Sequence, residues 1–163
     1  MSIKKQTWLV SAIVLLALVV DQVSKVYIKT HFELGEAREV FSWFWIAFVE
    51  NNGMAFGIEW FSKLLLTLFR IVAVGVIGWY IHLMIHKQQV RTGYLATIAM
   101  VMAGALGNII DCVFYGKIWG YAGWFHGRVV DMLYFPLIRN AAGECIFFRP
   151  VFNIADSFIT IAV

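Results

Sequence analysis

The chain has 163 residues, of which 61% are hydrophobic and only 14% are charged, and its mean hydropathy is +0.78. A soluble domain carries about a quarter charged residues, so this composition excludes an ordinary soluble protein and indicates an integral membrane protein. The net charge of +3 comes from basic residues that are scattered along the chain. Because they form no basic stripe, the sequence gives no indication of nucleic-acid binding.

Four apolar segments are candidates for membrane-spanning helices, since about 20 apolar residues cross the hydrocarbon core. They cover residues 7–24, 64–85, 93–114 and 151–163. The last reaches only about 20 Å against a core of roughly 30 Å, so we expect this helix to be incomplete in the given chain. A secretory signal peptide also opens with lysines and an apolar stretch, but the first segment has no small-residue cleavage site. We therefore expect four transmembrane helices in a single membrane domain over residues 1–163.

The distribution of Lys and Arg predicts the orientation of these helices. Basic residues are dense at the N-terminal tip (Lys4 and Lys5) and in the short loop after the second helix (Lys87 and Arg91). The two long loops hold more basic residues in total but at lower density, and the positive-inside rule works best for short loops. We expect both termini in the cytoplasm and both long loops outside.

The two long loops differ in what they predict. In the first loop, residues 38–50 are rich in aromatic and β-branched residues, which favour a strand. Asn52-Gly53 is a turn signal, and residues 54–58 are a candidate return strand. So many aromatic residues indicate a sheet at the membrane interface, the alternative being an irregular loop beside the lipid. The second loop, residues 115–150, is rich in Gly and aromatic residues and is a candidate interfacial lid.

Four aspartates lie in otherwise apolar surroundings: Asp21, Asp111, Asp131 and Asp156. Placing a carboxylate there is costly unless it has a partner or a task. Asp21 has a partner in reach, because Lys25 lies four residues further along the same helix face. Such acids in a membrane protein indicate a proton path, an ion site or catalysis.

Helical spacing gives the third and fourth helices a matching polar face. The residues are Gly104, Asn108 and Asp111 in the third helix, and Asn153, Asp156 and Thr160 in the fourth. A small residue such as Gly104 lets a neighbouring helix come close. All of these positions lie near the outer ends of their helices, so we expect one polar cluster at the depth of the outer leaflet.

A carboxylate cluster at this depth suits hydrolysis of an amide. Two carboxylates a few ångströms apart share one proton, because both cannot ionise cheaply. The ionised one takes a proton from water while the protonated one polarises a carbonyl, without a metal or a covalent nucleophile. The alternative is that the acids cap backbone groups or pair with bases and only hold the helices together. The spacing does not say which two acids are catalytic.

Other candidate residues carry weaker signals. His82 and His86 have a metal-like spacing, but they lie at the opposite membrane face with no third ligand near, so we expect no metal. Arg70, within the second helix, either reaches outward or pairs with one of the acids. Cys112 and Cys145 leave a disulfide and two free thiols both open.

Five motifs, in this order, resemble those of the bacterial lipoprotein signal peptidases (signal peptidase II), polytopic aspartyl proteases of the inner membrane. They are DQVSK (residues 21–25), ENNGMAFG (50–57), GALGNIID (104–111), GRVVDML (127–133) and FNIADS (152–157). The resemblance covers nearly the whole chain. It implies an α-helical polytopic membrane protein with four transmembrane helices and a small β-rich cradle on the outer face. The implied substrate is a diacylglyceryl-modified prolipoprotein, cut just before its lipidated cysteine.

The resemblance also implies roles for single residues. Asp131 and Asp156 would be the catalytic dyad. The other implied site residues are Asn51, Gly53, Asn108 and Asn153 as polar supports, and Asp21, Lys25 and Asp111 as residues that hold the architecture. No cofactor or metal is implied. We expect a monomer in the bacterial inner membrane, in contact with membrane lipids, with its active site near the periplasmic face.

Two features depart from the family pattern, and two other functions compete with it. The family's third-helix motif ends in Asp-Arg, whereas Cys112 follows Asp111 here. The role of that arginine is either lost or taken over by another base, for which Arg128 is a candidate. The intervals between Asp111, Asp131 and Asp156 are also longer than usual. A small proton- or ion-coupled transporter would also use intramembrane acids, although the chain has no inverted repeat. A non-catalytic assembly factor would leave the Asn/Asp faces unexplained.

Overall fold

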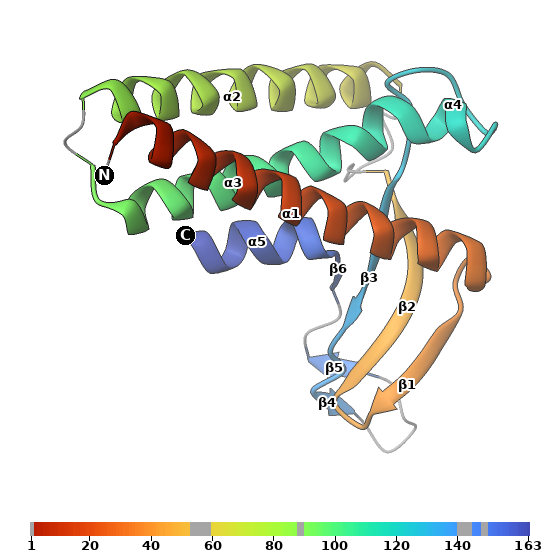
Figure 1. Ribbon diagram of the computed structural model, residues 1–163. Helices are drawn as coiled ribbons and strands as arrows, with labels where there is room; N and C mark the ends of the chain where they lie inside the picture. Colours follow the sequence, from red (N-terminus) through yellow and green to blue (C-terminus); the bar gives the residue numbers. More distant parts are fainter. Residues whose placement is uncertain (1, 53–59, 88–89, 140–144, 148–149) are drawn as a thin grey trace.

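The computed structural model describes residues 2–52, 60–87, 90–139, 145–147 and 150–163. A bundle of helices forms the body of the molecule, and a small antiparallel sheet projects from one end of it (Figure 1). The bundle comprises α1 (Ile3–His31), α2 (Trp60–Lys87), α3 (Thr92–Ile110) and the shorter α5 (Ile154–Ala162). Three segments, Ile3–His31, Lys63–Lys87 and Thr92–Ile118, are long and apolar enough to cross a membrane. They match the first three predicted spans.

The long helix α3 packs against α1, α2 and α5 (Figure 1). Small residues allow this, and Gly104 is the clearest case, because a Cβ atom there would lie 2.3 Å from the carbonyl oxygen of Ala155. Gly107 serves α1 in the same way, since its Cβ would lie 2.6 Å from Oδ2 of Asp21. The predicted close approach at Gly104 is therefore confirmed, and α5 is its neighbour.

The sheet has the strand order β1-β2-β3-β6, and its paired strands are antiparallel. Its strands are β1 (Ala37–Phe41), β2 (Phe44–Asn51), β3 (Val129–Tyr134) and β6 (Val151–Phe152). A separate two-stranded sheet contains β4 (Ile138–Arg139) and β5 (Cys145–Phe147).

The prediction of one continuous strand over residues 38–50 was wrong. The chain reverses at Ser42 and Trp43, and β1 pairs with β2 so that Arg38 faces Ile46. Reversal lets the aromatic segment pair its backbone N–H and C=O groups with itself. The predicted turn at Gly53 and the return strand at residues 54–58 lie outside the described residues. The other edge of β2 pairs with β3, which comes from the second long loop.

The fourth predicted span begins later than expected. Val151 and Phe152 form β6 and pair with β3, so the helix starts only after Asn153. The side chain of Asn153 accepts a hydrogen bond from the backbone N–H of Asp156 at 2.9 Å, and the Asp156 carboxylate accepts one from the backbone N–H of Asn153. This reciprocal capping box is a strong helix start signal. Apolar composition alone did not show the boundary between strand and helix.

At its C-terminal end α3 continues into a π-helical turn, η1 (Asp111–Tyr115), and the short α4 (Gly116–Ile118). In this wider turn, backbone carbonyl groups are left to accept hydrogen bonds from the loop that leads to β3. Phe125 N–H donates to the carbonyl of Val113 at 3.1 Å, and Gly127 N–H donates to that of Cys112 at 2.9 Å. A Cβ atom at Gly127 would lie 1.9 Å from the carbonyl oxygen of Asp111. Glycine here is therefore required for the close approach that starts β3.

Candidate active site

The predicted polar cluster lies at one end of the bundle, where α1, α3 and α5 meet the sheet (Figure 1). Its members come from six elements and from the residue that caps α5. They are Asp21 and Lys25 (α1), Asn51 (β2), Asn108 (α3), Asp111 (η1), Asp131 (β3), Asn153 before α5 and Asp156 within it. Hydrogen bonds and ion pairs connect all of them into one network. Gly53 lies outside the described residues.

One half of the network is a buried triad of Asp21, Lys25 and Asp111. The Lys25 ammonium lies 2.9 Å from Oδ2 of Asp21 and 2.8 Å from Oδ2 of Asp111. Its third hydrogen bond goes to Oδ1 of Asn108 at 3.1 Å. A lysine ammonium has three donors, so each finds an acceptor. This arrangement satisfies the condition under which charges are tolerated in a low-dielectric interior.

The two triad carboxylates also hold backbone groups next to the predicted dyad. Oδ1 of Asp21 accepts the backbone N–H of Ala155 at 2.9 Å, and Oδ2 of Asp111 accepts that of Val130 at 3.2 Å. Ala155 directly precedes Asp156, and Val130 directly precedes Asp131. The triad therefore places the backbone on which both dyad residues stand.

Sequence reasoning missed two members of this network. Gln22 donates from Nε2 to Asp111 at 3.0 Å and to the carbonyl of Gly107 at 3.2 Å. Tyr115 closes the network by donating its hydroxyl hydrogen to Oε1 of Gln22 at 3.1 Å. Gln22 stands in the DQVSK motif next to Asp21, and a buried amide in a membrane helix was the signal that could have identified it.

The other half of the network contains Asp131 and Asp156. The Asn153 side-chain amide donates to Oδ1 of Asp131 at 2.8 Å, and Asn51 also donates to this carboxylate. The Asn108 side-chain amide donates to Oδ1 of Asp156 at 2.8 Å. Asn108 and Asn153 are themselves joined at 3.0 Å. The amides therefore hold two carboxylates, one from a strand and one from a helix, at a single site.

The electrostatic environments of the two carboxylates differ. Asp131 is 2% exposed, whereas Asp156 is half-buried. Burial and the neighbouring charge of Asp156 raise the pKa of Asp131 to about 6, against an opposing effect of the hydrogen bonds from Asn153 and Asn51. A carboxyl group with such a pKa keeps or releases its proton near neutral pH. This is the asymmetry expected of two acids that share one proton.

An apolar groove of about 520 Å³ lies beside this site. Side chains from α1, β2, β3 and the start of α5 line it: Val19, Val20, Val23, Ser24, Tyr27, Ile28, Ile46, Met132, Leu133 and Ile154. Met132 follows Asp131 directly, so the groove and the dyad share one strand. Val19, Val20 and Val23 are also exposed on the outside of α1, so the groove opens on the lipid-facing surface.

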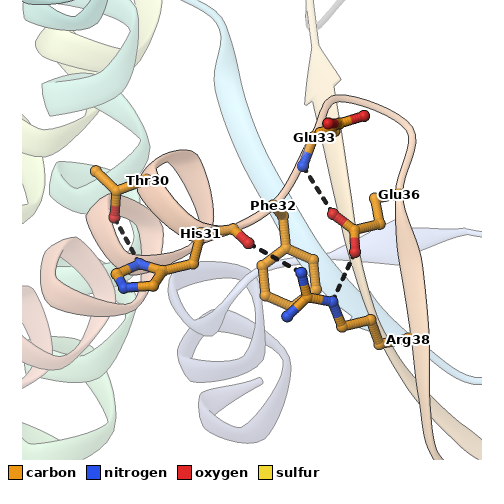
Figure 2. Close-up of a pocket in the computed structure, with 6 residues that line it drawn as sticks. All are labelled: Thr30, His31, Phe32, Glu33, Glu36 and Arg38. Carbon is orange, nitrogen blue, oxygen red and sulfur yellow. Dashed lines mark hydrogen bonds and ion pairs between the residues drawn. The ribbon is translucent and has the colours of Figure 1, made fainter.

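A second cavity, of about 570 Å³, lies where α1 passes into β1, and none of the dyad or triad residues line it (Figure 2). Its polar groups bind one another. Arg38 lies over the Phe32 ring at 4.1 Å and donates to Glu36 at 2.6 Å and to the carbonyl of His31 at 3.0 Å. These contacts fix the angle between α1 and the sheet.

The family model of signal peptidase (SPase) II matches residues 13–163. The chain belongs to this family. A lipoprotein signal peptidase of Porphyromonas gingivalis is 46% identical, over 94% of this chain and 79% of the relative. Similar enzymes of Amoebophilus asiaticus and Streptococcus pneumoniae are 35% and 32% identical, each over 98% of this chain, and over 76% and 90% of their own lengths.

Solved structures agree with this membership. Two bacterial membrane enzymes are 30% and 28% identical, with TM-scores of 0.70 and 0.71. Each match covers 94% of this chain, and 81% and 86% of the solved chains respectively. The predicted combination of apolar helices with a small sheet at one end of the bundle is therefore the fold of this signal peptidase II.

Arg128, the candidate to take over the role of the family arginine, lies beside a different acid from Asp111. Arg128 forms an ion pair with Glu50 at 3.0 Å, beside Lys29, which also binds Glu50. Burial alone would raise the pKa of Glu50, but hydrogen bonds from Lys29 and Arg128 outweigh it and lower that pKa. This cluster lies at the sheet, and the guanidinium that meets Cys112 comes from Arg70 on α2, at 3.4 Å. Helix packing therefore decided which of the two arginines contacts Cys112.

The remaining candidates stay outside the network. The His82 and His86 ring centroids lie 4.1 Å apart, with the rings tilted by 38°, near the far end of α2. In the described ranges, no group of three or more His, Cys, Asp or Glu side chains could hold a metal ion. Cys112 and Cys145 are both free thiols, so of the two redox states left open by the sequence, the structure has the reduced one.

Proposed function

We propose that this signal peptidase II is an aspartyl endopeptidase with Asp131 and Asp156 as its catalytic dyad. It removes signal peptides from diacylglyceryl-modified prolipoproteins and cuts just before the lipidated cysteine. One observation carries the proposal. Two carboxylates from different elements meet at an end of the helix bundle, joined through amide groups, and one of them has a pKa raised to about 6.

The chemistry follows from the different surroundings of the two acids. Asp131 is the buried acid with the raised pKa, so it holds the shared proton and donates it to the oxygen of the scissile carbonyl. Asp156, the other carboxylate, takes a proton from the attacking water. In the second step Asp156 returns that proton to the leaving nitrogen while Asp131 recovers one from the tetrahedral intermediate. The cycle leaves both carboxyl groups as they began.

The apolar groove supports a substrate with acyl chains. It shares β3 with the dyad and opens toward the lipid, so an acyl chain in it would hold the adjoining peptide at the depth of the carboxylates. Such anchoring raises the effective concentration of the scissile bond. The enzyme should therefore depend strongly on lipidation of its substrate.

We place this chain in the bacterial inner membrane as a monomer, with both termini in the cytoplasm and the dyad near the periplasmic face. Density of Lys and Arg in the short connections supports this orientation. Single cysteines at Glu36 and at Lys87, in a Cys112→Ser/Cys145→Ser background, should react with an impermeant reagent from the outer and the inner face respectively. The reverse pattern would place the active site in the wrong compartment for exported substrates.

The proton- or ion-coupled transporter is not supported. The family match is to a peptidase along most of the chain. The acids also gather at one end of the bundle beside the sheet, whereas a transporter site lies near the midplane of the membrane.

Cleavage of a defined substrate tests the proposal. The substrate is a peptide that spans a lipoprotein cleavage site and carries diacylglyceryl-cysteine, and an otherwise identical unlipidated peptide is the control. The wild-type enzyme should cleave the lipidated peptide before the cysteine, and Asp131→Asn and Asp156→Asn should not. Equal cleavage of both peptides would refute the lipid requirement, and full activity of either variant would refute the dyad.

A further inference from the structure

Arg70 is a charged residue in a membrane-spanning helix, and among the described residues its guanidinium is hydrogen-bonded to a weak acceptor. It lies in the span Lys63–Lys87 of α2 and is half-buried. Among the residues that the structure describes, the acceptor that meets its guanidinium is the thiol of Cys112, 3.4 Å from Nη1. Lys25, by contrast, directs its hydrogen bonds to two carboxylates and an amide.

The thiol satisfies few of the hydrogen-bond donors of the guanidinium. Arginine has five N–H donors in a planar fork, and a thiol sulfur is a weak acceptor. A charge held within a membrane span marks a functional site by default, because its desolvation requires a reason. The donors of Arg70 therefore point to an acceptor that arrives with the substrate.

The place of Arg70 suits such a role. Cys112, which it contacts, follows Asp111 of the triad. The same face of α2 carries Thr67, which is 1% exposed, and Lys63, whose ammonium lies 3.3 Å from Oδ1 of Asn52. Asn52 follows Asn51, which binds Asp131. This face of α2 therefore reaches both η1 and the end of β2, the two segments that border the dyad.

The depth of Arg70 suits the ester groups of a lipid. Between Lys63 and Arg70 the helix rises about 10 Å at 1.5 Å per residue, which puts the Arg70 backbone inside the hydrocarbon edge. A long arginine side chain extends from such a position toward the polar boundary. Acyl ester carbonyls lie at that boundary, and they are neutral acceptors that a guanidinium can bind.

We propose that Arg70 is a substrate-positioning residue whose guanidinium binds the acyl ester carbonyls of the diacylglyceryl group. The inference rests on the proposed function, since it assumes a diacylglyceryl substrate. It also accounts for the departure at Cys112. Where the family motif has an arginine after Asp111, this chain has a small thiol, and the guanidinium reaches the same place from α2.

The test combines two substrates with variants of Arg70. One substrate carries diacylglyceryl-cysteine, and the other carries a dialkyl ether analogue that lacks both carbonyls. With the ester substrate, Arg70→Gln should raise KM about 10- to 100-fold, the range for a lost hydrogen bond to a charged group, and change kcat little. With the ether substrate, KM of the wild-type enzyme should already be raised, and Arg70→Gln should add less than about threefold.

Two further variants separate positioning from folding. Arg70→Gln/Cys112→Arg returns a guanidinium to the same place from η1 and should recover KM for the ester substrate to within about fivefold of wild type. Arg70→Lys keeps the charge but not the fork and should lie between wild type and Arg70→Gln. Cys112→Ser is the matched control, because it keeps a small acceptor beside Arg70, and its KM should stay within about threefold of wild type.

The outcomes distinguish this inference from the proposed function. Failure of the wild-type enzyme to cut the ester substrate would refute the function itself. Cleavage by the wild type with an unchanged KM in Arg70→Gln would overturn the role of Arg70 alone. Equal losses on ester and ether substrates would also overturn it. If Arg70→Gln fails to fold, the ester-to-ether ratio of KM in Arg70→Lys decides, and a ratio equal to that of wild type counts against the proposal.

Discussion

Two clusters of acids lie side by side at the end of the bundle, and their carboxylates have different kinds of partner. In the triad, Lys25 lies within 2.9 Å of the carboxylates of Asp21 and Asp111. In the dyad, the hydrogen bonds that join Asp131 and Asp156 to the network come from neutral amides and backbone groups.

We propose that this difference separates the acids that hold the structure from the acids that carry out the reaction. A carboxylate paired with a buried ammonium has its charge compensated, and we propose that such a carboxylate holds the structure. Two crowded carboxyl groups can share one proton and release it near neutral pH, and hydrolysis requires such a proton. The sequence shows four similar aspartates, and we propose that their partners in space decide which two are reactive.

The largest effect should come from neutralising the dyad. Asp131→Asn and Asp156→Asn should each lower kcat by roughly 10³- to 10⁴-fold, because each fixes one protonation state of a pair that must alternate. The double variant should be no worse than either single one, since the two act as a unit. Cleavage of the lipidated peptide measures this. Substantial activity in either single variant, together with an inactive but folded Asp111→Asn, would mean that the two clusters have been assigned the wrong way round.

Removing the cation of the triad should destabilise the protein. Lys25→Met leaves two buried carboxylates without compensation, which costs about 3–5 kcal/mol. Thermal unfolding in detergent should show a large fall in Tm and a low yield of folded protein. Lys117→Met, on the exposed α4, is the matched control and should leave Tm unchanged. A stable Lys25→Met protein that has lost only activity would make the triad part of the chemistry.

A change of pH should act on the dyad with a defined sign. The pKa of Asp131 in the folded protein is about 6, above the ordinary value of about 4. The folded state therefore binds the proton more tightly than the unfolded state, and this contribution to stability is lost as the pH rises from 4 to 6. Asp131→Asn removes the loss and should be more stable than wild type by about 1–3 kcal/mol at pH 7.

At pH 4 the Asp131→Asn variant and wild type should be nearly equal in stability, because Asp131 is then protonated in the folded state and about half protonated in the unfolded state. Unfolding measured from pH 4 to pH 7 gives the comparison. A variant that is less stable than wild type at pH 7 would show that the carboxylate supports the fold, as those of the triad do.

The smallest effect concerns Asn153, which belongs to both the fold and the dyad. Asn153→Ala removes the cap of α5 and should cost about 1 kcal/mol of stability. Asn153→Ser keeps a capping oxygen but loses the amide that donates to Asp131, so it should retain stability and still lower kcat. Full kcat in Asn153→Ser would show that Asn153 serves only to cap α5 and does not support the reaction.

Much of this protein follows from local patterns. The apolar runs predicted three spanning helices, and helical spacing placed Asp21 with Lys25 and Asn108 with Asp111 on common faces. Gly104 predicted a close helix neighbour, which is α5. These inferences succeed because helix periodicity and small-residue packing depend on residues close together in the sequence.

Other features depended on contacts between distant segments. The hairpin of β1 and β2, the late start of α5, and the origin of β3 in the second long loop all depend on which strand pairs with which. No local pattern places Val130 against Asp111 or Ala155 against Asp21.

The sequence by itself determined the class of membrane protein, the family motifs and the residues available for the site. Only the tertiary structure decided that Lys25 compensates Asp21 and Asp111, that Asn153 and Asn51 donate hydrogen bonds to the buried Asp131, and that Arg70, rather than Arg128, meets Cys112. The physical reason is that burial and charge compensation are properties of the space around a side chain, which helix and strand packing create.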